Sequence, residues 1–182
     1  DLRILYWSDT DDLEKKIVDT FIYDLEKETE AKINPDKPYE LWNEALTDDE
    51  GIKRSDFLQI LSPYRSELFG TSNINSVIQK IINKHNLQNH GSVGGITYFD
   101  KIIQIYNRPK SNPYWAYNFK TGKKEKIEIF NGEMGFTVPH AFDKKWKWSG
   151  FRMSKFQTQF SRRESYRIDF TSESSVTGNI EL

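Results

Sequence analysis

The sequence predicts a mixed α/β chain, in which a lobe built on a mostly parallel sheet precedes a small antiparallel barrel. The first observation is the nearly continuous apolar run at 57–61, which is typical of a strand buried on both faces. The second is a stripe of apolar residues at helical spacing over 74–82, with Thr71 or Ser72 placed to cap that helix. The third is a change of period near residue 101, after which short runs alternate as strands do.

In the first half, two strands are expected to alternate with two helices. Residues 2–7 predict a strand, and residues 13–29 predict an amphipathic helix. The second strand and helix are those at 57–61 and 74–82. Because each strand precedes a helix, we expect the two strands to pair in parallel through a right-handed crossover.

A carboxylate cluster and a long connection accompany these elements. The cluster lies where the first helix begins, and there helix capping is a better interpretation than a metal site. The connection covers 34–55 and is predicted to hold one short helix at 39–46. The clustered carboxylates are Asp9, Asp11 and Asp12.

The second half is predicted to form short antiparallel strands. Asn131-Gly132 is a strong hairpin signal between two of them. Several short strands at this spacing favour a small barrel. The expected strands are 101–106, 127–130, 136–138, 146–151, 155–160 and 165–170.

Composition limits the classes of function. The chain has 182 residues, a net charge of −1 and no cysteine. Disulfides, thiolate catalysis and cysteine-ligated zinc are therefore excluded, and a reducing compartment, the cytoplasm, is favoured. No apolar run approaches the roughly eighteen residues of a membrane span, so we expect no membrane partner. The chain begins without Met inside a strand-like run, which suggests a piece of a longer protein.

Charge is distributed unevenly along the chain. The first fifty residues are rich in acids, whereas the stretch 101–167 is rich in bases. We therefore expect any polyanionic partner to meet the second half.

Several short blocks in a fixed order resemble a known family. The first block resembles the segment around motif IV in the second RecA-like domain of RecD-type superfamily 1 DNA helicases. Two later blocks resemble that family's Gly-Asp-Lys-Val-Met-Gln, Asn and Asn-Gly-Asp-x-Gly patterns. The residues are Leu61-Ser62-Pro63-Tyr64-Arg65, Gly70-Thr71, Ile74-Asn75, Ile78-Gln79, Asn83, Phe99-Asp100-Lys101-Ile102-Ile103-Gln104, Asn107 and Phe130-Asn131-Gly132-Glu133-Met134-Gly135.

The resemblance implies both a fold and a function. It implies a RecA-like parallel-sheet lobe of a P-loop NTPase helicase over 1–138, an inserted antiparallel Src-homology-3-like β-barrel over 139–176, and a return strand at 177–182. The implied parent is an ATP-dependent DNA helicase with ATP and Mg as cofactors. Its implied partners are single-stranded DNA, along which it moves from 5′ to 3′, and the N-terminal RecA-like domain of the same chain.

The chain departs from the family pattern in four places. Phe99 stands where the family has Gly, Glu133 stands where it has Asp, and 109–126 is a longer aromatic insert. In addition, the Gly-rich stretch 91–95 has no Lys-Ser/Thr after it, so the sequence lacks a phosphate loop. We therefore expect the chain alone to bind neither ATP nor Mg and to be inactive.

Arg65 is the candidate catalytic and nucleotide-binding residue. It follows the strand predicted at 57–61, and ligands gather at the carboxyl ends of parallel strands. The resemblance implies that this guanidinium reaches toward ATP phosphates across the cleft between the two RecA-like domains. The alternative is a surface arginine paired with Glu67.

Four polar residues near Arg65 are candidates for DNA contact. Ser62, Thr71, Ser72 and Asn75 surround the start of the predicted helix, where free amides would suit a phosphate. Helix capping is an equal interpretation of Thr71 and Ser72. For Asn75 and Gln79, four residues apart, a polar pair that stabilises the helix is favoured.

A second candidate DNA surface lies in the basic half. Flat aromatic rings stack on bases and cations follow phosphates, although aromatic residues in small barrels usually belong to the core. The candidates are Trp115, Tyr117, Lys123, Lys124 and Lys147, within a wider set that includes Phe119, Lys120, Lys126, Lys155 and Arg167.

Other chemistry receives no support from the sequence. His85, His90 and His140 lack the spacing of a metal site and are interpreted as surface or loop residues. No Ser-His-Asp set is visible. The second hypothesis for function is a stand-alone module, an α/β domain with a barrel, that binds nucleic acid or protein without using ATP.

Overall fold

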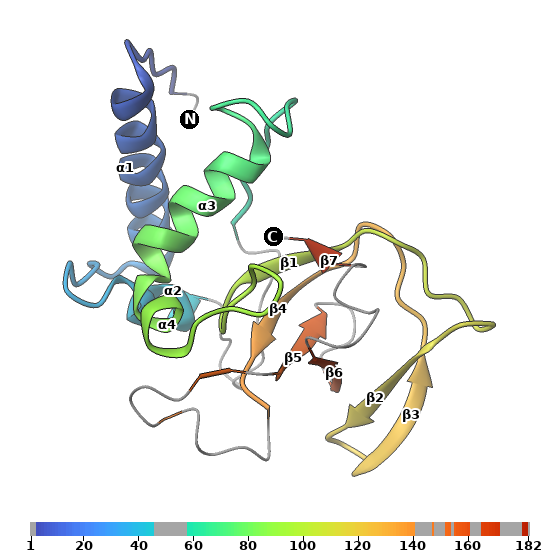
Figure 1. Cartoon of the computed structure of the whole chain (residues 1–182). Helices are drawn as coiled ribbons and strands as arrows, with labels where there is room; N and C mark the ends of the chain where they lie inside the picture. Colours follow the sequence, from blue (N-terminus) through green and yellow to red (C-terminus); the bar gives the residue numbers. More distant parts are fainter. Residues whose placement is uncertain are drawn as a thin grey trace.

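A layer of helices lies against an antiparallel sheet (Figure 1). The computed structural model describes residues 3–45, 58–140, 147, 152–153, 155–160, 165–171 and 180–181. The mixed α/β class is therefore as predicted. Predictions for 46–57 and for most of 141–151, which include the strand expected at 146–151, lie outside the described residues.

Helix α1 (Thr10–Thr29) forms as the apolar spacing predicts, with Leu13, Phe21 and Leu25 among its buried residues. Asp9 is its N-cap, and the carboxylate of Asp9 accepts the amide of Asp12 at 2.9 Å. The capping interpretation of this acidic cluster is therefore confirmed.

Three shorter helices complete the helical layer. Helices α2 (Pro38–Ala45) and α3 (Thr71–Ile82) match the predicted elements, whereas α4 (Lys84–His90) was not predicted. The N-cap of α3 is Gly70, and no side chain caps it. The prediction that Thr71 or Ser72 is the cap is therefore wrong.

The sheet is antiparallel at every pairing between its described strands. Its strand order is β3-β2-β6-β5-β4-β1-β7, so β4 and β5 lie in the middle. The strands predicted at 155–160 and 165–170 are confirmed as β5 and β6. The strands are β1 (Lys101–Gln104), β2 (Tyr114–Asn118), β3 (Lys123–Ile127), β4 (Met134–Val138), β5 (Lys155–Phe160), β6 (Tyr166–Thr171) and β7 (Ile180–Glu181).

The sheet curls until its two sides meet. A bridge between Arg108 and Ile129 joins the continuation of β1 to the continuation of β3. The space inside this barrel-like sheet is filled by an apolar core that includes Phe156, Phe160 and Phe170. The expectation of a small antiparallel barrel therefore holds in its coarse form.

A second core joins the helices to the outer face of β4. Phe136 of β4 packs among Phe21, Leu25, Trp42 and Ile82, and all five are almost fully buried. Burial of side chains of this size stabilises the fold by about 2 kcal/mol each, so these contacts fix the helical layer on the sheet.

The parallel sheet predicted for the first half is absent from the described residues. Residues 3–7 and 58–61 belong to no strand, and they have no ladder partner there. Leu61, Tyr6 and Ile4 are 86%, 82% and 67% exposed. The strands predicted from these two apolar runs are therefore wrong within the described residues, because a strand also requires a neighbour that supplies hydrogen bonds.

The hairpin predicted at Asn131-Gly132 is wrong. Strand β3 pairs with β2, whereas β4 pairs with β1 and β5. The turn at 130–133, with φ 89° at Gly132, instead carries the chain around a corner between β3 and β4.

The insert 109–126 contains β2, and strands on both sides of the proposed domain boundary at 138 belong to one sheet.

At Gly135 the backbones of β4 and β5 lie too close together to leave room for a side chain. A Cβ atom at Gly135 would overlap the backbone oxygen of Gln159 and lie 3.1 Å from its carbonyl carbon. Because that backbone is part of the sheet, we expect Gly135→Ala to lower the unfolding free energy by about 2 kcal/mol or more in urea titrations.

The control is Gly95→Ala. A Cβ there meets nothing within 4 Å, although φ is +84°. The left-handed conformation alone should cost about 1 kcal/mol. An equal or smaller loss for Gly135→Ala would contradict the close approach of the two strands.

Candidate functional site

Arg65 is presented by a loop that closes on itself. The hydroxyl of Ser62 donates to the carbonyl of Phe69 at 2.8 Å and accepts the amide of Tyr64 at 3.2 Å. The amide of Gly70 donates to the carbonyl of Glu67 at 2.7 Å. Ser62, a candidate for DNA contact, therefore holds the loop together, and Arg65 lies exposed upon it.

Gly70 is required by the close approach of this loop. A Cβ atom at Gly70 would lie 2.6 Å from the backbone carbon and oxygen of Arg65. Such a distance is shorter than any ordinary non-bonded contact. The backbone of Arg65 therefore lies directly against the first turn of α3.

The first amides of α3 are occupied. The amide of Thr71 donates to the carbonyl of Tyr64, and the amide of Ser72 donates to the carbonyl of Arg65, both at 3.0 Å. The amide of Asn73 donates to the carbonyl of Gly70 at 3.1 Å. The premise that Thr71 and Ser72 offer free amides to a phosphate is wrong, because these amides anchor the Arg65 loop.

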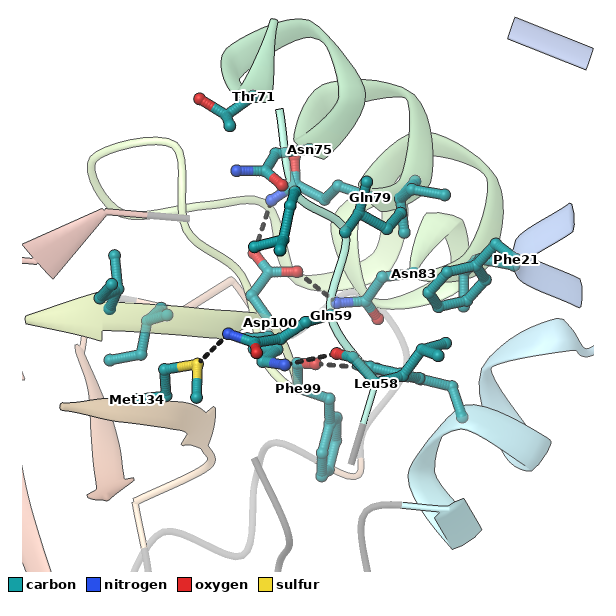
Figure 2. Close-up of a pocket in the computed structure, with 18 residues that line it drawn as sticks. Phe21, Leu58, Gln59, Thr71, Asn75, Gln79, Asn83, Phe99, Asp100 and Met134 are labelled. Atoms are coloured by element: carbon teal, nitrogen blue, oxygen red, sulfur yellow. Dashed lines mark hydrogen bonds between the residues drawn. The ribbon is translucent and has the colours of Figure 1, made fainter. Parts of the chain in front are cut away.

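A cavity of about 330 Å³ opens between α3, the segment 58–61 and β1 (Figure 2). Thr71, Asn75 and Gln79 follow one another along the side of α3 that faces it. Thr71 and Asn75 are half-buried, whereas Ser72 is exposed outside this lining. The structure thus brings two of the four polar candidates near Arg65 into one cavity.

The polar wall of this cavity is organised by Asp100. Its Oδ1 accepts the side-chain amide of Asn83 at 2.7 Å (Figure 2). Its Oδ2 accepts the side-chain amide of Gln79 at 2.5 Å and the backbone amide of Thr97 at 2.7 Å. Gln79 also donates to the carbonyl of Gly95 at 2.9 Å, so its side-chain amide joins α3 to the segment that precedes β1.

Asp100 is buried at 5% exposure. Burial raises the pKa of Asp100 from its ordinary value of 3.8 to about 6, against the lowering effect of the three hydrogen bonds. The effect of desolvation therefore exceeds that of the donors. No periodicity in the sequence marks Asp100 as the centre of this network, so the sequence analysis missed its role.

The later blocks of the resemblance also meet one another. The amide of Gln104 donates to the carbonyl of Glu133, and the amide of Gly132 donates to the carbonyl of Gln104, both at 2.9 Å. Asn107 accepts the amide of Asn131 at 2.9 Å. Residues that are 24 to 29 positions apart are thus linked between the end of β1 and the turn before β4.

Phe99 occupies a left-handed conformation, with φ of 65°. Glycine adopts that conformation without strain, whereas a bulky residue does so rarely. The family pattern has glycine at this position. Phe99, one of the departures from the resemblance, therefore stands in a backbone conformation that glycine adopts more easily.

The candidates on the β2–β3 hairpin lie on two faces: Trp115, Tyr117 and Lys124 share one face, and Lys123 lies on the other. Trp115 lies opposite Lys126 in the ladder of β2 and β3, and Tyr117 lies opposite Lys124. Residues directly opposite share a face, so these four form one outer face. Tyr117 is also opposite Arg167 of β6, which extends the same face.

Lys123 points to the other face of the hairpin. It lies opposite Asn118, in line with Glu125 and with the buried Tyr114 of the barrel core. Because successive side chains of a strand point to opposite faces, the sequence alone could have assigned Lys123 and Lys124 to different faces. Lys147 is exposed, but its chain neighbours lie outside the described residues.

The histidines differ from their sequence interpretation at one position. His90 is buried at 5% exposure and packs against Tyr98, so its assignment to the surface is wrong. His85 stacks on Tyr39, and His140 lies 3.3 Å from the carboxylate of Asp169. Among the described residues, no group of three or more His, Asp or Glu could hold a metal ion.

Comparisons with protein-family models, with curated proteins and with solved structures found no match for this chain. None of the helices in the described part has the length and apolar character needed to cross a membrane.

The described residues do not form a complete nucleotide site. The first amides of α3 are already used by loop carbonyls, so they cannot cradle phosphates. The acidic groups of this part do not gather into a metal-binding cluster. Arg65 is exposed on a loop whose backbone is held by hydrogen bonds to the start of α3.

Asp100 gives a pH dependence whose sign can be predicted. Because folding raises its pKa from 3.8 to about 6, its stabilising contribution is complete below about pH 4 and is lost as pH rises through 6. We expect the unfolding free energy of the native chain, relative to Asp100→Asn, to fall by on the order of 2 to 3 kcal/mol over that window.

Urea unfolding between pH 4 and pH 7.5 measures this difference. Asp19→Asn is the control, because Asp19 is exposed on α1 and its carboxylate pairs with the neighbouring Lys15 at 3.1 Å. If the native and Asp100→Asn curves ran parallel across this range, Asp100 would not titrate as the geometry implies.

Proposed function

We propose that the chain is part of an ATP-dependent DNA helicase, to which it contributes one side of the nucleotide cleft and a surface for single-stranded DNA. The observation that carries the proposal is the convergence of the resembling blocks. Gln79, Asn83 and Asp100 meet in one network, and Gln104, Asn107 and the turn at 130–133 meet in another. Contact between separate blocks supports their origin in one shared architecture.

The proposed role of Arg65 is to contribute one positive charge to the nucleotide cleft. A planar guanidinium suits the charge that develops on a transferring phosphoryl group. The closed loop and the tight approach at Gly70 support this role, because they fix the backbone from which Arg65 extends. The phosphate cradle and Mg ligands would come from the other RecA-like domain of the parent, so no hydrolytic step is assigned to this chain.

The rival function is a nucleic-acid or protein-binding module that never uses ATP. The closed barrel-like sheet with its own apolar core favours it, because such a unit needs no nucleotide to fold. The two proposals differ in the surrounding gene. A Walker-type phosphate loop and an acidic Mg-binding motif encoded upstream would support the helicase, whereas a start codon close to Asp1 would support the module.

The 182-residue chain alone is expected to show no DNA-stimulated ATP hydrolysis above background. A single arginine without a phosphate cradle or metal ligand cannot assemble the reaction. Release of phosphate, measured with and without single-stranded DNA, tests this expectation. Turnover by the purified chain would contradict the proposal that the phosphate cradle and the Mg ligands come from another domain.

In a longer protein that contains the phosphate loop, Arg65→Ala should lower kcat for ATP by about 10³-fold or more, by analogy with other arginines that act on transferring phosphates. Nucleotide affinity should change little. The matched control is Lys80→Ala, which removes one exposed cation from α3. Normal turnover in Arg65→Ala would return this residue to the status of a surface arginine.

A further inference from the structure

We propose that the outer face of β2, β3 and β6 is a two-rung site for single-stranded nucleic acid. Each rung combines an aromatic ring on β2 with at least one cation on a neighbouring strand. This inference rests on the proposed function and deepens it, because it gives the DNA contact a place and a geometry. We call this surface the rung face; its members are Trp115, Tyr117, Phe119, Lys124, Lys126 and Arg167.

The first rung is Trp115 with Lys126. Trp115 is 59% exposed, and the Nζ atom of Lys126 lies 5.1 Å from its ring centroid. Tryptophan is well buried on average and is enriched at binding interfaces. Its ring can stack on a base while the ammonium beside it meets a phosphate.

The second rung is Tyr117 with Lys124 and Arg167. Both cations lie opposite Tyr117, one on each neighbouring strand. Phe119 meets Tyr117 edge to face at 5.0 Å, and the guanidinium carbon of Arg167 lies 5.3 Å from the ring centroid of Phe119. This rung therefore contains two rings and two cations.

The spacing of the rungs suits consecutive nucleotides. Residues two apart on a strand are separated by about 7 Å, since the rise is about 3.4 Å per residue. A strand whose bases are pulled apart to about twice the duplex spacing of 3.4 Å would place successive bases on the two rings. Duplex bases are already stacked on both sides, so the rung face suits a single strand.

The acidic residue of β3 is turned away from this face. Glu125 accepts hydrogen bonds on the opposite side from Thr121 at 2.7 Å, from Tyr166 at 2.9 Å and from Asn118 at 3.2 Å. These bonds lower the pKa of Glu125, so it stays ionised. They also hold the base of the hairpin, which keeps the two rungs in place without a ligand.

Two carboxylates lie toward the Trp115 end, and both have partners. Asp169 accepts the side-chain amide of Gln157 at 2.6 Å and lies 3.3 Å from His140. Glu128 lies 4.0 Å from Lys110. The positive charge of the rung face is therefore greatest toward Lys124 and Arg167, which complements a polyanion entering from the hairpin tip.

The test measures binding of fluorescent oligothymidylate to the 182-residue chain over a range of salt concentrations. Lys123→Ala and Lys124→Ala form a matched pair, because adjacent lysines of one strand are removed from opposite faces. We expect Lys124→Ala to flatten the slope of log affinity against log salt by about 0.7, and Lys123→Ala to leave it unchanged. Equal effects of the two variants would overturn the assignment of the face.

Stacking is tested with a second probe, an oligomer of the same length whose sugars carry no bases. The native chain should prefer oligothymidylate over this probe by about 5- to 150-fold per stacked base. Trp115→Ala should reduce that preference while leaving the affinity for the base-free probe unchanged, and Trp115→Phe should retain most of it. Equal affinity of the native chain for both probes would contradict the stacking of bases on Trp115 and Tyr117. This comparison uses the native chain, so it remains valid even if Trp115→Ala does not fold.

The outcomes separate this inference from the proposed function. ATP hydrolysis that depends on Arg65, together with DNA binding that is indifferent to Lys124 and Trp115, would overturn the rung face alone. Binding that follows the rungs, in a gene that lacks any phosphate loop, would overturn the helicase and retain the site. Figure 1 shows the β2–β3 hairpin well away from α3, so variants there leave the Arg65 loop untouched.

Discussion

The buried carboxylate of Asp100 is the constraint on which the arrangement of helices and sheet depends. It ties Gln79 of α3 and Asn83, the residue that follows α3, to the turn that leads into β1, and its own backbone pairs with Thr137 of β4. A buried carboxylate left without these donors would cost several kcal/mol, so these three segments must assemble together. The apolar contacts around Phe136 then close the same interface.

From this junction the molecule extends toward two functional ends. At one end α3 begins at Gly70, and its first amides hold the loop that presents Arg65. At the other end the sheet continues from β1 and β4 through β5 and β6 to the hairpin that carries the rung face. The proposed nucleotide contact and the proposed DNA contact thus belong to one connected framework. A displacement of α3 relative to β1 would therefore break or rearrange the hydrogen bonds of Asp100 to Gln79 and Asn83.

Local patterns predicted α1, α3, β5 and β6, because the burial of one helix stripe or one strand face leaves a clear period in the sequence. Helix α4 was missed because Lys84–His90 is polar and has no apolar stripe. The apolar runs at 2–7 and 57–61 were assigned to strands, but an apolar run does not specify a hydrogen-bonding partner. The Asp100 network and the pairing of β2 with β6 join residues far apart in sequence, which no local period can reveal.

The most direct test of the account follows the tryptophan side chains during titration with oligothymidylate, by nuclear magnetic resonance of their indole N–H groups. Trp115 lies exposed on the rung face, whereas Trp42 is buried in the helical layer and donates to the carbonyl of Phe99 at 3.2 Å. The account predicts that the Trp115 signal shifts with saturation and that the Trp42 signal stays in place. Bound DNA with an unchanged Trp115 signal would contradict it.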